Sequence, residues 1–430
     1  MEILNKNTYI KTAADKKQAI EQLALPEKVL QFGTGVLLRA LPDYYIEHAN
    51  QNGRFNGRVV MVKSTPTPVE SVYINQDCLF TQVIRGIDDG KPSEAFILNA
   101  SISRCLHASE HWTEVMQFAI SPHLKVVISN TTEVGIVFKE ENINDGCPDS
   151  FPAKLLAVLY RRFEFYNGDM NMGLVILPTE LIDKNAEQLK SILNQLANYN
   201  LLNSDFIYWL NEANDFCNTL VDRIVPGKLL DSSKQEIESR LGYQDELMIM
   251  SEPFALWAIE SESAIVSDRL SFINPDKGCI LVNDLHIYKE LKLRLLNATH
   301  SFACAYAIRS GFTYVREAMQ NEIFRAFIVG LINEIKAVLL TDTTITKKMT
   351  DGFGNAVIDR FSNPYIDHKW ESISLHYRTK VEVRCIPLIK KAVLMENGAY
   401  QHMLKGLQEF NLFSQGELNQ FLEKELHVKE

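Results

Sequence analysis

The chain has 430 residues, of which 46% are hydrophobic and 23% charged, a composition that excludes a disordered chain and suits a folded protein of two or three domains. Its 44 Lys and Arg against 54 Asp and Glu leave a net charge of −10, which argues against general affinity for nucleic acid or anionic lipid. The chain shows no secretory signal and no run approaching the ~20 apolar residues of a membrane helix. We therefore expect a cytoplasmic protein without nucleic-acid or membrane partners.

Short apolar runs alternate with helical patterns in the first half of the chain. Helices are predicted over 36–48, before the turn signal Asn52-Gly53, and over 153–165. Strands alternating with helices indicate βαβ units, so we predict a Rossmann-type α/β domain over residues 1–230. Its buried strands are expected at 28–32, 58–63, 78–84, 124–129 and 174–177.

Helical periodicity takes over from about residue 205. Only residues 278–283, GCILVN, still read as a strand, and the polar segment 228–246 could mark the transition. We predict a mainly α-helical substrate and catalytic domain over residues 231–430. Its helices, with one before the boundary, are expected at 205–225, 250–262, 286–310, 314–340, 367–382 and 400–427.

The seven cysteines are widely scattered, and no two have CxxC spacing. This pattern is typical of free thiols in a reducing compartment rather than of disulfides or a Cys-based zinc site. The sequence offers no cluster of metal ligands either, so no metal cofactor is expected.

Gly33-Thr34-Gly35 follows the first predicted strand and opens a helix, as a dinucleotide-binding loop does. The first glycine would permit the turn, and the second would let a pyrophosphate approach the backbone. Leu38 stands where the usual third glycine would be. A match this short fits an ordinary strand–helix turn equally well.

The acidic residue that usually binds the adenosine ribose is missing, since Lys63, Ser64 and Thr65 follow the second strand. A hydroxyl or the backbone could hold the 2′-OH, and Lys63 could tolerate a 2′-phosphate, so the residues leave NAD and NADP open. Asn130, Thr131 and Thr132 follow a later strand, where they could line the cofactor cleft or cap a helix.

The segment from Lys292 to His300 carries the side chains best suited to carbonyl chemistry. At about 100° per residue, Asn297 lies roughly 140° and His300 roughly 80° from Lys292, on one side of an α-helix. Lysine can transfer the hydroxyl proton, and the amide can donate to the developing oxyanion. A solvated Lys, a capping Asn and a core His would give the same triplet by chance.

Lys380 and Arg384 are four residues apart, so they lie on one face of a predicted helix. They could form a solvated basic stripe or a clamp for an anionic substrate.

Six segments together resemble the polyol-specific long-chain dehydrogenases, the family that includes mannitol dehydrogenases and hexuronate reductases. They span most of the chain in the family's order: QFGTGVLLRA (31–40), SNTTEVGI (129–136), NTLVDRIVPG (218–227), SEPFALWAIE (251–260), KLRLLNATHS (292–301) and RFSNPYIDH (360–368). The resemblance implies an NAD(H)-dependent oxidoreductase acting on a small sugar or sugar acid.

The resemblance also implies residue roles. The Lys-x4-Asn-x2-His pattern is the family's catalytic signature, so Lys292 would be the general acid and base, with Asn297 and His300 as its partners. The cofactor would contact Phe32, Gly33, Thr34, Gly35, Arg39, Asn130, Thr131 and Thr132, and the substrate Glu180, His368, Lys380 and Arg384.

Within the family, QDCLFTQVIRG (76–86) and LPTELIDKN (177–185) most resemble the tagaturonate reductases, also called altronate oxidoreductases. This implies interconversion of D-tagaturonate and D-altronate. Fructuronate reductase and mannitol or mannitol-1-phosphate dehydrogenase remain alternatives, as does a nucleotide-binding protein without catalysis. Leu181 stands where mannitol dehydrogenases have a second oxyanion-binding Asn.

Overall fold

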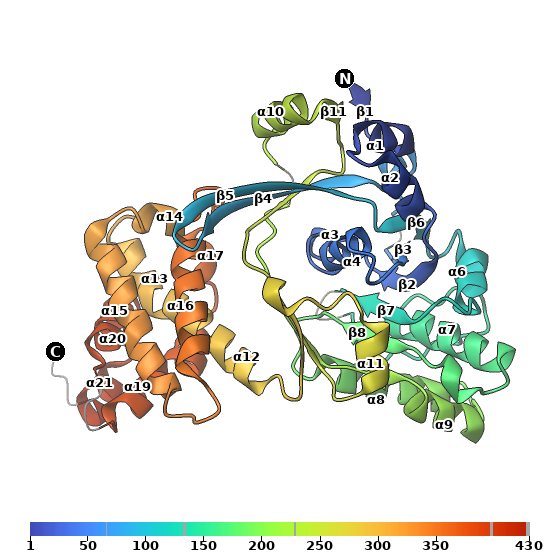
Figure 1. The fold of residues 1–430 in the computed structure, drawn as a ribbon. Helices are drawn as coiled ribbons and strands as arrows, with labels where there is room; N and C mark the ends of the chain where they lie inside the picture. The colour runs from blue at the N-terminus through green and yellow to red at the C-terminus, as the bar shows by residue number, and fades with distance from the viewer. Residues whose placement is uncertain (66, 132–134, 228, 396–398, 427–430) are drawn as a thin grey trace. The chain divides into compact units, whose positions relative to one another are not determined.

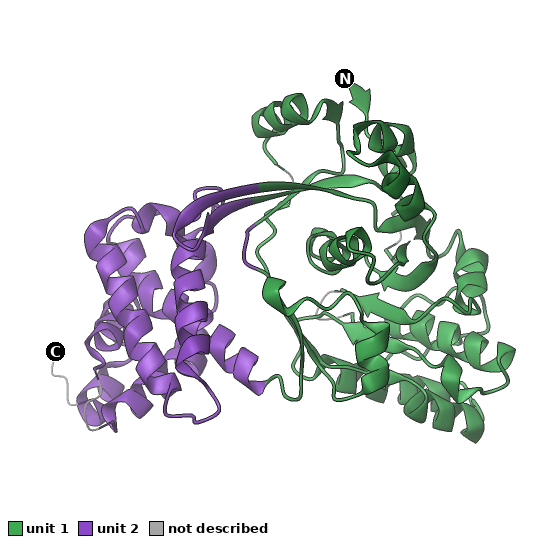
Figure 2. Ribbon diagram, viewed as in Figure 1, with its two compact units in different colours: residues 1–84, 95–251, 255–285 green, residues 85–94, 252–254, 286–430 purple. Residues whose placement is uncertain are grey.

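A computed structural model describes residues 1–430 apart from 66, 132–134, 228, 396–398 and 427–430. The chain forms two compact units, each built from segments that are separate in the sequence (Figure 2). The first unit contains residues 1–84, 95–251 and 255–285, and the second contains 85–94, 252–254 and 286–430. No helix in the described part of the chain is long and apolar enough to cross a membrane.

A six-stranded parallel sheet forms the centre of the first unit (Figure 1). Numbered by their order along the chain, its strands lie in the order 3-2-1-4-5-6, which is that of the Rossmann fold. The predicted Rossmann-type α/β domain is therefore confirmed. Across the sheet the strands are β6 (Ile102–His107), β3 (Arg58–Lys63), β2 (Glu27–Phe32), β7 (Val126–Ser129), β8 (Val175–Pro178) and β9 (Asp215–Phe216).

Alternate residues of these strands supply two hydrophobic layers. Val60 and Val62 pack in one cluster, whereas Val59 and Met61 pack in the other. Both faces are covered, which explains why these strands read as continuous apolar runs. The first layer includes helices α6 (Trp112–Ala119), α7 (Phe151–Phe165), α8 (Asn185–Tyr199) and α9 (Ser204–Glu212), and the second includes α3 (Val36–Ala40), α4 (Pro42–Gln51) and α11 (Ala264–Arg269).

The single helix predicted over 36–48 is wrong, because the chain breaks it at Leu41. Pro42 occupies the first turn of α4, where its missing N–H costs nothing, and it cannot continue α3. The predicted end of this region is confirmed, since Asn52 caps α4 and Gly53 turns with φ of +64°.

Strands replace part of two predicted helices. The region 205–225 is helical only in α9, and 250–262 contains β12 and β13 instead of a helix, because short apolar runs do not distinguish the two structures by periodicity. The strands form three smaller sheets: β10 (Thr219–Asp222), β13 (Leu256–Glu260) and β14 (Cys279–Val282); β12 (Ile249–Ser251), β4 (Phe80–Asp88) and β5 (Lys91–Asn99); and β1 (Glu2–Ile3) with β11 (Tyr243–Gln244).

The main division between the units falls after Leu285, which differs from the expected boundary at residues 230 and 231. The polar segment expected to mark the transition lies within the first unit, where it forms α10 (Asp231–Leu241) and β11 (Tyr243–Gln244), which pairs with β1. The β10-β13-β14 sheet then keeps the chain in the first unit up to residue 285. The remaining α-helices of the first unit are α1 (Lys6–Thr12), α2 (Lys16–Leu23) and α5 (Ser71–Asn75).

The second unit is mainly helical, as predicted. Two of its helical stretches are π-helices, Leu291–Ala298 and Val381–Cys385, which we call the first and the second π-helix. Its α-helices are α12 (His286–Glu290), α13 (Thr299–Arg309), α14 (Val315–Ala318), α15 (Glu322–Leu339), α16 (Lys347–Phe361), α17 (Trp370–Ile373), α18 (Tyr377–Lys380), α19 (Ile386–Val393), α20 (Gln401–Phe413) and α21 (Asn419–Glu425).

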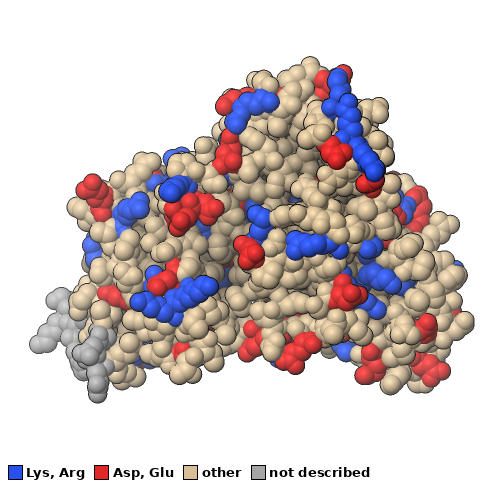
Figure 3. All heavy atoms as spheres, in the orientation of Figure 1, with Lys and Arg blue, Asp and Glu red and all other residues tan. Residues whose placement is uncertain are grey.

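Basic and acidic side chains lie among one another on the face shown in Figure 3. Exposed ion pairs such as Arg378–Glu382, at 3.0 Å, contribute little to stability because solvent screens them. Other charged side chains are buried or half-buried, and they are described below.

Candidate active site

The chain turns sharply at Gly33, directly after β2. Gly33 has a φ of +130°, and its N–H donates to the carbonyl of Val62 at 2.9 Å. A Cβ on Gly33 would lie 2.8 Å from Leu38 Cδ1 and 3.0 Å from the carbonyl oxygen of Asn130. Glycine is therefore required here by backbone conformation and by close packing.

Gly35 has a different part in the same loop. Its φ is −64°, which any residue can adopt, and a Cβ on it would meet no heavy atom within 4 Å beyond its chain neighbours. Open space beside the backbone is what a pyrophosphate needs in order to approach. Thr34, between the two glycines, accepts a hydrogen bond from Tyr73 at 3.4 Å through its carbonyl. The loop thus fits a dinucleotide.

Two other expected cofactor contacts lie inside the first unit. Phe32 is fully buried, with its ring centroid 5.2 Å from that of Phe151. Arg39 is buried and donates through NH1 to the carbonyl of Leu247 at 2.7 Å, with its guanidinium 5.3 Å from the ring centre of Phe80. Direct contact with a cofactor stays a prediction for each.

Asn130 and Thr131 follow the carboxyl end of β7, beside the glycine loop. The N–H of Asn130 donates to the carbonyl of Phe32 at 3.1 Å, and its side-chain amide donates to Thr179 Oγ1 at 3.0 Å. Ligands of open α/β sheets bind at this end of the strands, so the placement suits a cofactor contact. Thr132, the third residue expected here, lies outside the described residues.

Glu180 stands in the first unit, where its carboxylate holds the segment after β7. It accepts from the N–H of Thr131 at 2.8 Å, from Thr131 Oγ1 at 3.2 Å and from Ser129 Oγ at 3.2 Å. Burial raises the pKa of this carboxyl, while these hydrogen bonds lower it. The contacts of Glu180 hold Ser129 and Thr131, and its expected contact with substrate stays a prediction. Leu181, which follows, is exposed.

The end of β3 offers a polar group for which the described residues provide no partner. The hydroxyl of Ser64 is buried and, among the described residues, makes no hydrogen bond. Lys63 Nζ donates to the carbonyl of Pro68 at 2.9 Å. A ribose hydroxyl would satisfy Ser64, so the residues present fit the adenosine half of a nicotinamide cofactor.

The first π-helix changes how Lys292 and Asn297 relate. Residues five apart are joined by the hydrogen-bond pattern of a π-helix, so these two side chains lie one turn apart on one face. The α-helical spacing of roughly 140° expected from sequence is therefore wrong. Both residues are half-buried. A proton donor and an amide donor on one face are suited to one carbonyl oxygen.

His300 follows on α13 as a buried, neutral imidazole. Burial and then the nearby His368, Arg360 and Arg384 hold its pKa well below the usual value. It bonds the backbone of Leu296, whereas Nε2 has no partner among the described residues. Nδ1 therefore carries the proton, and Nε2 is left as a hydrogen-bond acceptor.

Aromatic rings fix the orientation of His300. Its ring stacks on Phe361 with centroids 4.1 Å apart, and its centroid lies 5.1 Å from that of His368. His368 is half-buried, and burial together with Lys380 and Arg360 lowers its pKa. Two neutral imidazoles thus stand among several cations in the second unit.

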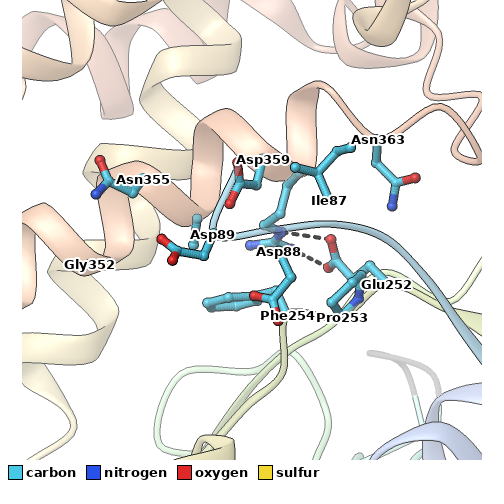
Figure 4. A pocket seen from close by; sticks show the side chains of 12 residues that line it. Ile87, Asp88, Asp89, Glu252, Pro253, Phe254, Gly352, Asn355, Asp359 and Asn363 are labelled. Carbon is cyan, nitrogen blue, oxygen red and sulfur yellow. Dashed lines mark hydrogen bonds and ion pairs between the residues drawn. The ribbon is translucent and has the colours of Figure 1, made fainter. Parts of the chain in front are cut away.

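Arg360 is one of these cations, and Glu252 neutralises it. Arg360 Nε lies 3.0 Å from Glu252 Oε2, and NH2 lies 2.9 Å from Oε1 (Figure 4). The two side chains are 3% and 0% exposed. Both line a pocket of about 220 Å³ together with Asp88 and Asp89 at the end of β4, Asn355 and Asp359 of α16, and Asn363, which follows α16.

Lys380 and Arg384 are half-buried rather than part of a solvated stripe. Lys380 Nζ donates to the carbonyl of Ile373 at 2.8 Å, whereas the hydrogen-bond partner of Arg384 among the described residues is Ser301 Oγ, at 3.5 Å. Burial lowers the pKa of both groups, and Arg384 also lowers that of Lys380. Two partly desolvated cations beside neutral histidines favour an anionic ligand.

Sequence reasoning missed Arg360, Glu252 and Phe361 as site residues. They lie within segments 251–260 and 360–368, but nothing local indicates that Glu252 pairs with a residue 108 positions away. All seven cysteines have free thiols, and in the described part of the chain no three His, Cys, Asp or Glu side chains form a metal-ligand group.

Two family models match the chain in succession. Residues 27–271 match the mannitol dehydrogenase Rossmann domain, and residues 284–425 match the mannitol dehydrogenase C-terminal domain. The chain is also 37% identical over 386 residues to an altronate oxidoreductase of Halalkalibacterium halodurans, covering 89% of this chain and 74% of that protein. It is 36% identical over 392 residues to the Bacillus subtilis altronate oxidoreductase, covering 91% and 78%.

Solved structures share the fold at lower sequence identity. A D-sorbitol dehydrogenase without substrate matches with a TM-score of 0.78 and 18% identity, over 95% of this chain and 84% of that one. The mannitol 2-dehydrogenase of Pseudomonas fluorescens, solved with NAD and D-mannitol, matches with a TM-score of 0.67 and 20% identity, over 96% and 84%.

Proposed function

The chain belongs to the mannitol dehydrogenase family, and from this premise we propose that it is an NAD(H)-dependent oxidoreductase that interconverts D-tagaturonate and D-altronate. Membership supports a nicotinamide-dependent enzyme acting on CH–OH groups. The observation that carries the finer proposal is the set of cations around His300 and His368, since a sugar acid brings the negative charge that a neutral polyol lacks.

The nicotinamide ring, when bound, supplies the hydride for reduction or accepts it in oxidation. Gly33, Thr34 and Gly35 would hold the pyrophosphate, with Asn130 and Thr131 beside it. Ser64 would bind the ribose hydroxyl, which favours NAD. Because the enzyme would depend on NAD(H), we expect it in the cytoplasm, where this cofactor is available.

Lys292 would donate a proton to the ketone oxygen during reduction and take it back during oxidation. The Asn297 amide would donate a hydrogen bond to the same oxygen as negative charge develops there. His300 Nε2, an acceptor without a partner among the described residues, would orient the sugar by accepting from a neighbouring hydroxyl.

The substrate carboxylate would lie against Arg384, with Lys380 and His368 near it. Arg384 is the better anchor, because Lys380 already donates to Ile373 and Arg360 is neutralised by Glu252. A half-buried guanidinium offers two parallel donors to a carboxylate, which gives geometric selection as well as attraction.

The proposal is tested by NADH oxidation at 340 nm with tagaturonate, fructuronate, fructose and fructose 6-phosphate, compared by kcat/KM, and repeated with NADPH. Tagaturonate with NADH is expected to give the highest value. A higher value with fructuronate or fructose would assign the enzyme to another branch of the family. Absence of turnover with all four sugars, despite NADH binding, would indicate a nucleotide-binding protein without this catalysis.

A further inference from the structure

Arg294 joins the two π-helices of the second unit. It lies on the first π-helix, and its NH1 donates to the backbone carbonyls of Val383 at 3.2 Å and Arg384 at 3.3 Å on the second. Its Nε lies 3.1 Å from Glu290 Oε2, one helical turn away, which orients the guanidinium. The Arg294 side chain is 15% exposed, so the contact is largely shielded from solvent.

Pro387 removes one α-helical hydrogen bond next to the second π-helix. In an α-helix, the carbonyl of Val383 would accept from the N–H of residue 387, and proline has none. The proline ring also crowds the carbonyl four residues earlier, which opens the helix at this point. Arg294 donates to this carbonyl and to that of Arg384 from the first π-helix.

Each π-helix carries part of the proposed active site. Lys292 and Asn297 belong to the first, and Arg384 belongs to the second. Arg294 is two residues from Lys292, so it points to another side of the helix and has no need to touch the substrate. The hydrogen bonds of Arg294 therefore fix the distance between Lys292 and Asn297 on the first π-helix and Arg384 on the second.

We propose that Arg294 is a positioning residue that sets the distance between the ketone-binding and carboxylate-binding groups, and thereby selects keto acids by the spacing of these two functions. This inference rests on the proposed function only for the identity of the substrate. The link itself is a property of the fold, so it is tested separately from activity.

Four variants separate the link from its ion pair. Arg294→Met removes both the link and the ion pair. Arg294→Lys keeps the positive charge but lacks the planar guanidinium with its several donors, and Glu290→Gln removes the ion pair alone. Arg378→Met is the matched control, because Arg378 also forms an i,i+4 ion pair, with Glu382 at 3.0 Å. Arg294, Glu290 and Pro387 line an open pocket of about 230 Å³, so these changes leave water rather than a void.

The first readout is hydrogen exchange of the whole protein, followed by mass spectrometry. Amides of residues 381–393 are expected to exchange faster in Arg294→Met than in the wild type, and to be unchanged in Glu290→Gln and Arg378→Met. Unchanged exchange in Arg294→Met would show that the link does not hold the second π-helix, whatever the enzyme's substrate.

The second readout is the division of the loss between KM and kcat with the sugar acid. Arg294→Met should raise KM for tagaturonate about 10–100-fold, because a misplaced anchor costs up to two orders of magnitude, while KM for NADH stays at the control value. Arg294→Lys should recover part of the loss. Equal KM for tagaturonate in Arg294→Met and Arg378→Met would overturn the positioning role. If the wild type does not reduce tagaturonate, the proposed function fails, while the hydrogen-exchange result still decides whether Arg294 holds the second π-helix.

Discussion

Both carboxylate oxygens of Glu252 contact Arg360, at 2.9 and 3.0 Å, and this pair has almost no exposure to solvent. Arg360 in turn helps to keep His300 and His368 neutral. Glu252 thus holds a buried cation beside two imidazoles without leaving that cation uncompensated. The arrangement extends to lower pH the range in which both imidazoles are neutral and can accept hydrogen bonds.

We predict that Glu252→Gln lowers the free energy of unfolding by about 3–5 kcal/mol, because it leaves a buried guanidinium without its counter-charge. The matched exposed change, Glu382→Gln, removes a pair whose side chains are 64% and 51% exposed and should cost under about 1 kcal/mol. Urea denaturation followed by circular dichroism measures both. Similar losses for the two variants would contradict the account of the buried pair.

The buried carboxyl of Asp43 should make stability depend on pH. Burial raises its pKa to about 7, although Gln31 and Arg39 oppose the shift. Between the pKa of the unfolded state, near 4, and that of the folded state, about 7, the folded protein binds more protons than the unfolded chain. Protonation of Asp43 therefore favours folding at low pH, and this contribution is lost as the pH rises to 7.

Asp43→Asn removes that titration. Relative to the wild type, the variant should become more stable as the pH rises from 5 to 8. The gain should be about 1.4 kcal/mol for each pH unit between 5 and the Asp43 pKa of about 7. The difference in unfolding free energy between variant and wild type is measured at both pH values. A difference that stays constant would show that Asp43 is not protonated in the folded protein at pH 5.

The two glycines of the nucleotide loop should respond differently to substitution. Gly35→Val should raise the Kd for NADH about tenfold or more with little change in melting temperature, because its side chain fills only the ligand's space. Gly33→Ala should destabilise the fold by more than about 1 kcal/mol, because its φ of +130° is strained for alanine. Fluorescence titration and thermal melts separate the effects, and unaltered NADH binding in Gly35→Val would place the pyrophosphate elsewhere.

Neutralising the proposed anchor should cost binding of a charged substrate. Arg384→Gln is expected to lower kcat/KM with tagaturonate by about 10–150-fold, the value of a charge-assisted hydrogen bond of roughly 1.5–3 kcal/mol. Any neutral ketose that the enzyme accepts should be little affected. Equal losses on both substrates would assign Arg384 a structural role, and no loss on either would remove it from the site.

The sequence patterns located four of the six strands of the Rossmann sheet, but they missed β6 and β9, and the predicted strand at 78–84 is part of β4 in another sheet. The strand at 58–63 was predicted with the limits that β3 has, because strands buried on both faces are continuous apolar runs bounded by turn residues. The same rule failed at 250–262, where a short apolar run fits either structure. The break before Pro42 follows from proline chemistry, whereas hydrophobic periodicity alone predicts one continuous helix.

The candidate site was predictable only in part. Lys292, Asn297 and His300 were identified from their spacing and resemblance, but the π-helix that places Lys292 and Asn297 on one face has no sequence signature that we recognised. The pair of Arg360 with Glu252 depends on tertiary packing, which no local pattern encodes. Spacing indicates chemistry within one helix, whereas contacts between distant segments require the fold.

The central claim is that Lys292 transfers the proton in a nicotinamide-dependent carbonyl reduction. The direct measurement is kcat for NADH-dependent tagaturonate reduction by the wild type, by Lys292→Ala and by Lys390→Ala, a control on an exposed lysine paired with Glu425 at 2.7 Å. Lys292→Ala should lower kcat by about 10²–10⁴ while NADH still binds with wild-type affinity, and Lys390→Ala should have no effect. Turnover near the wild-type rate in Lys292→Ala would contradict the account.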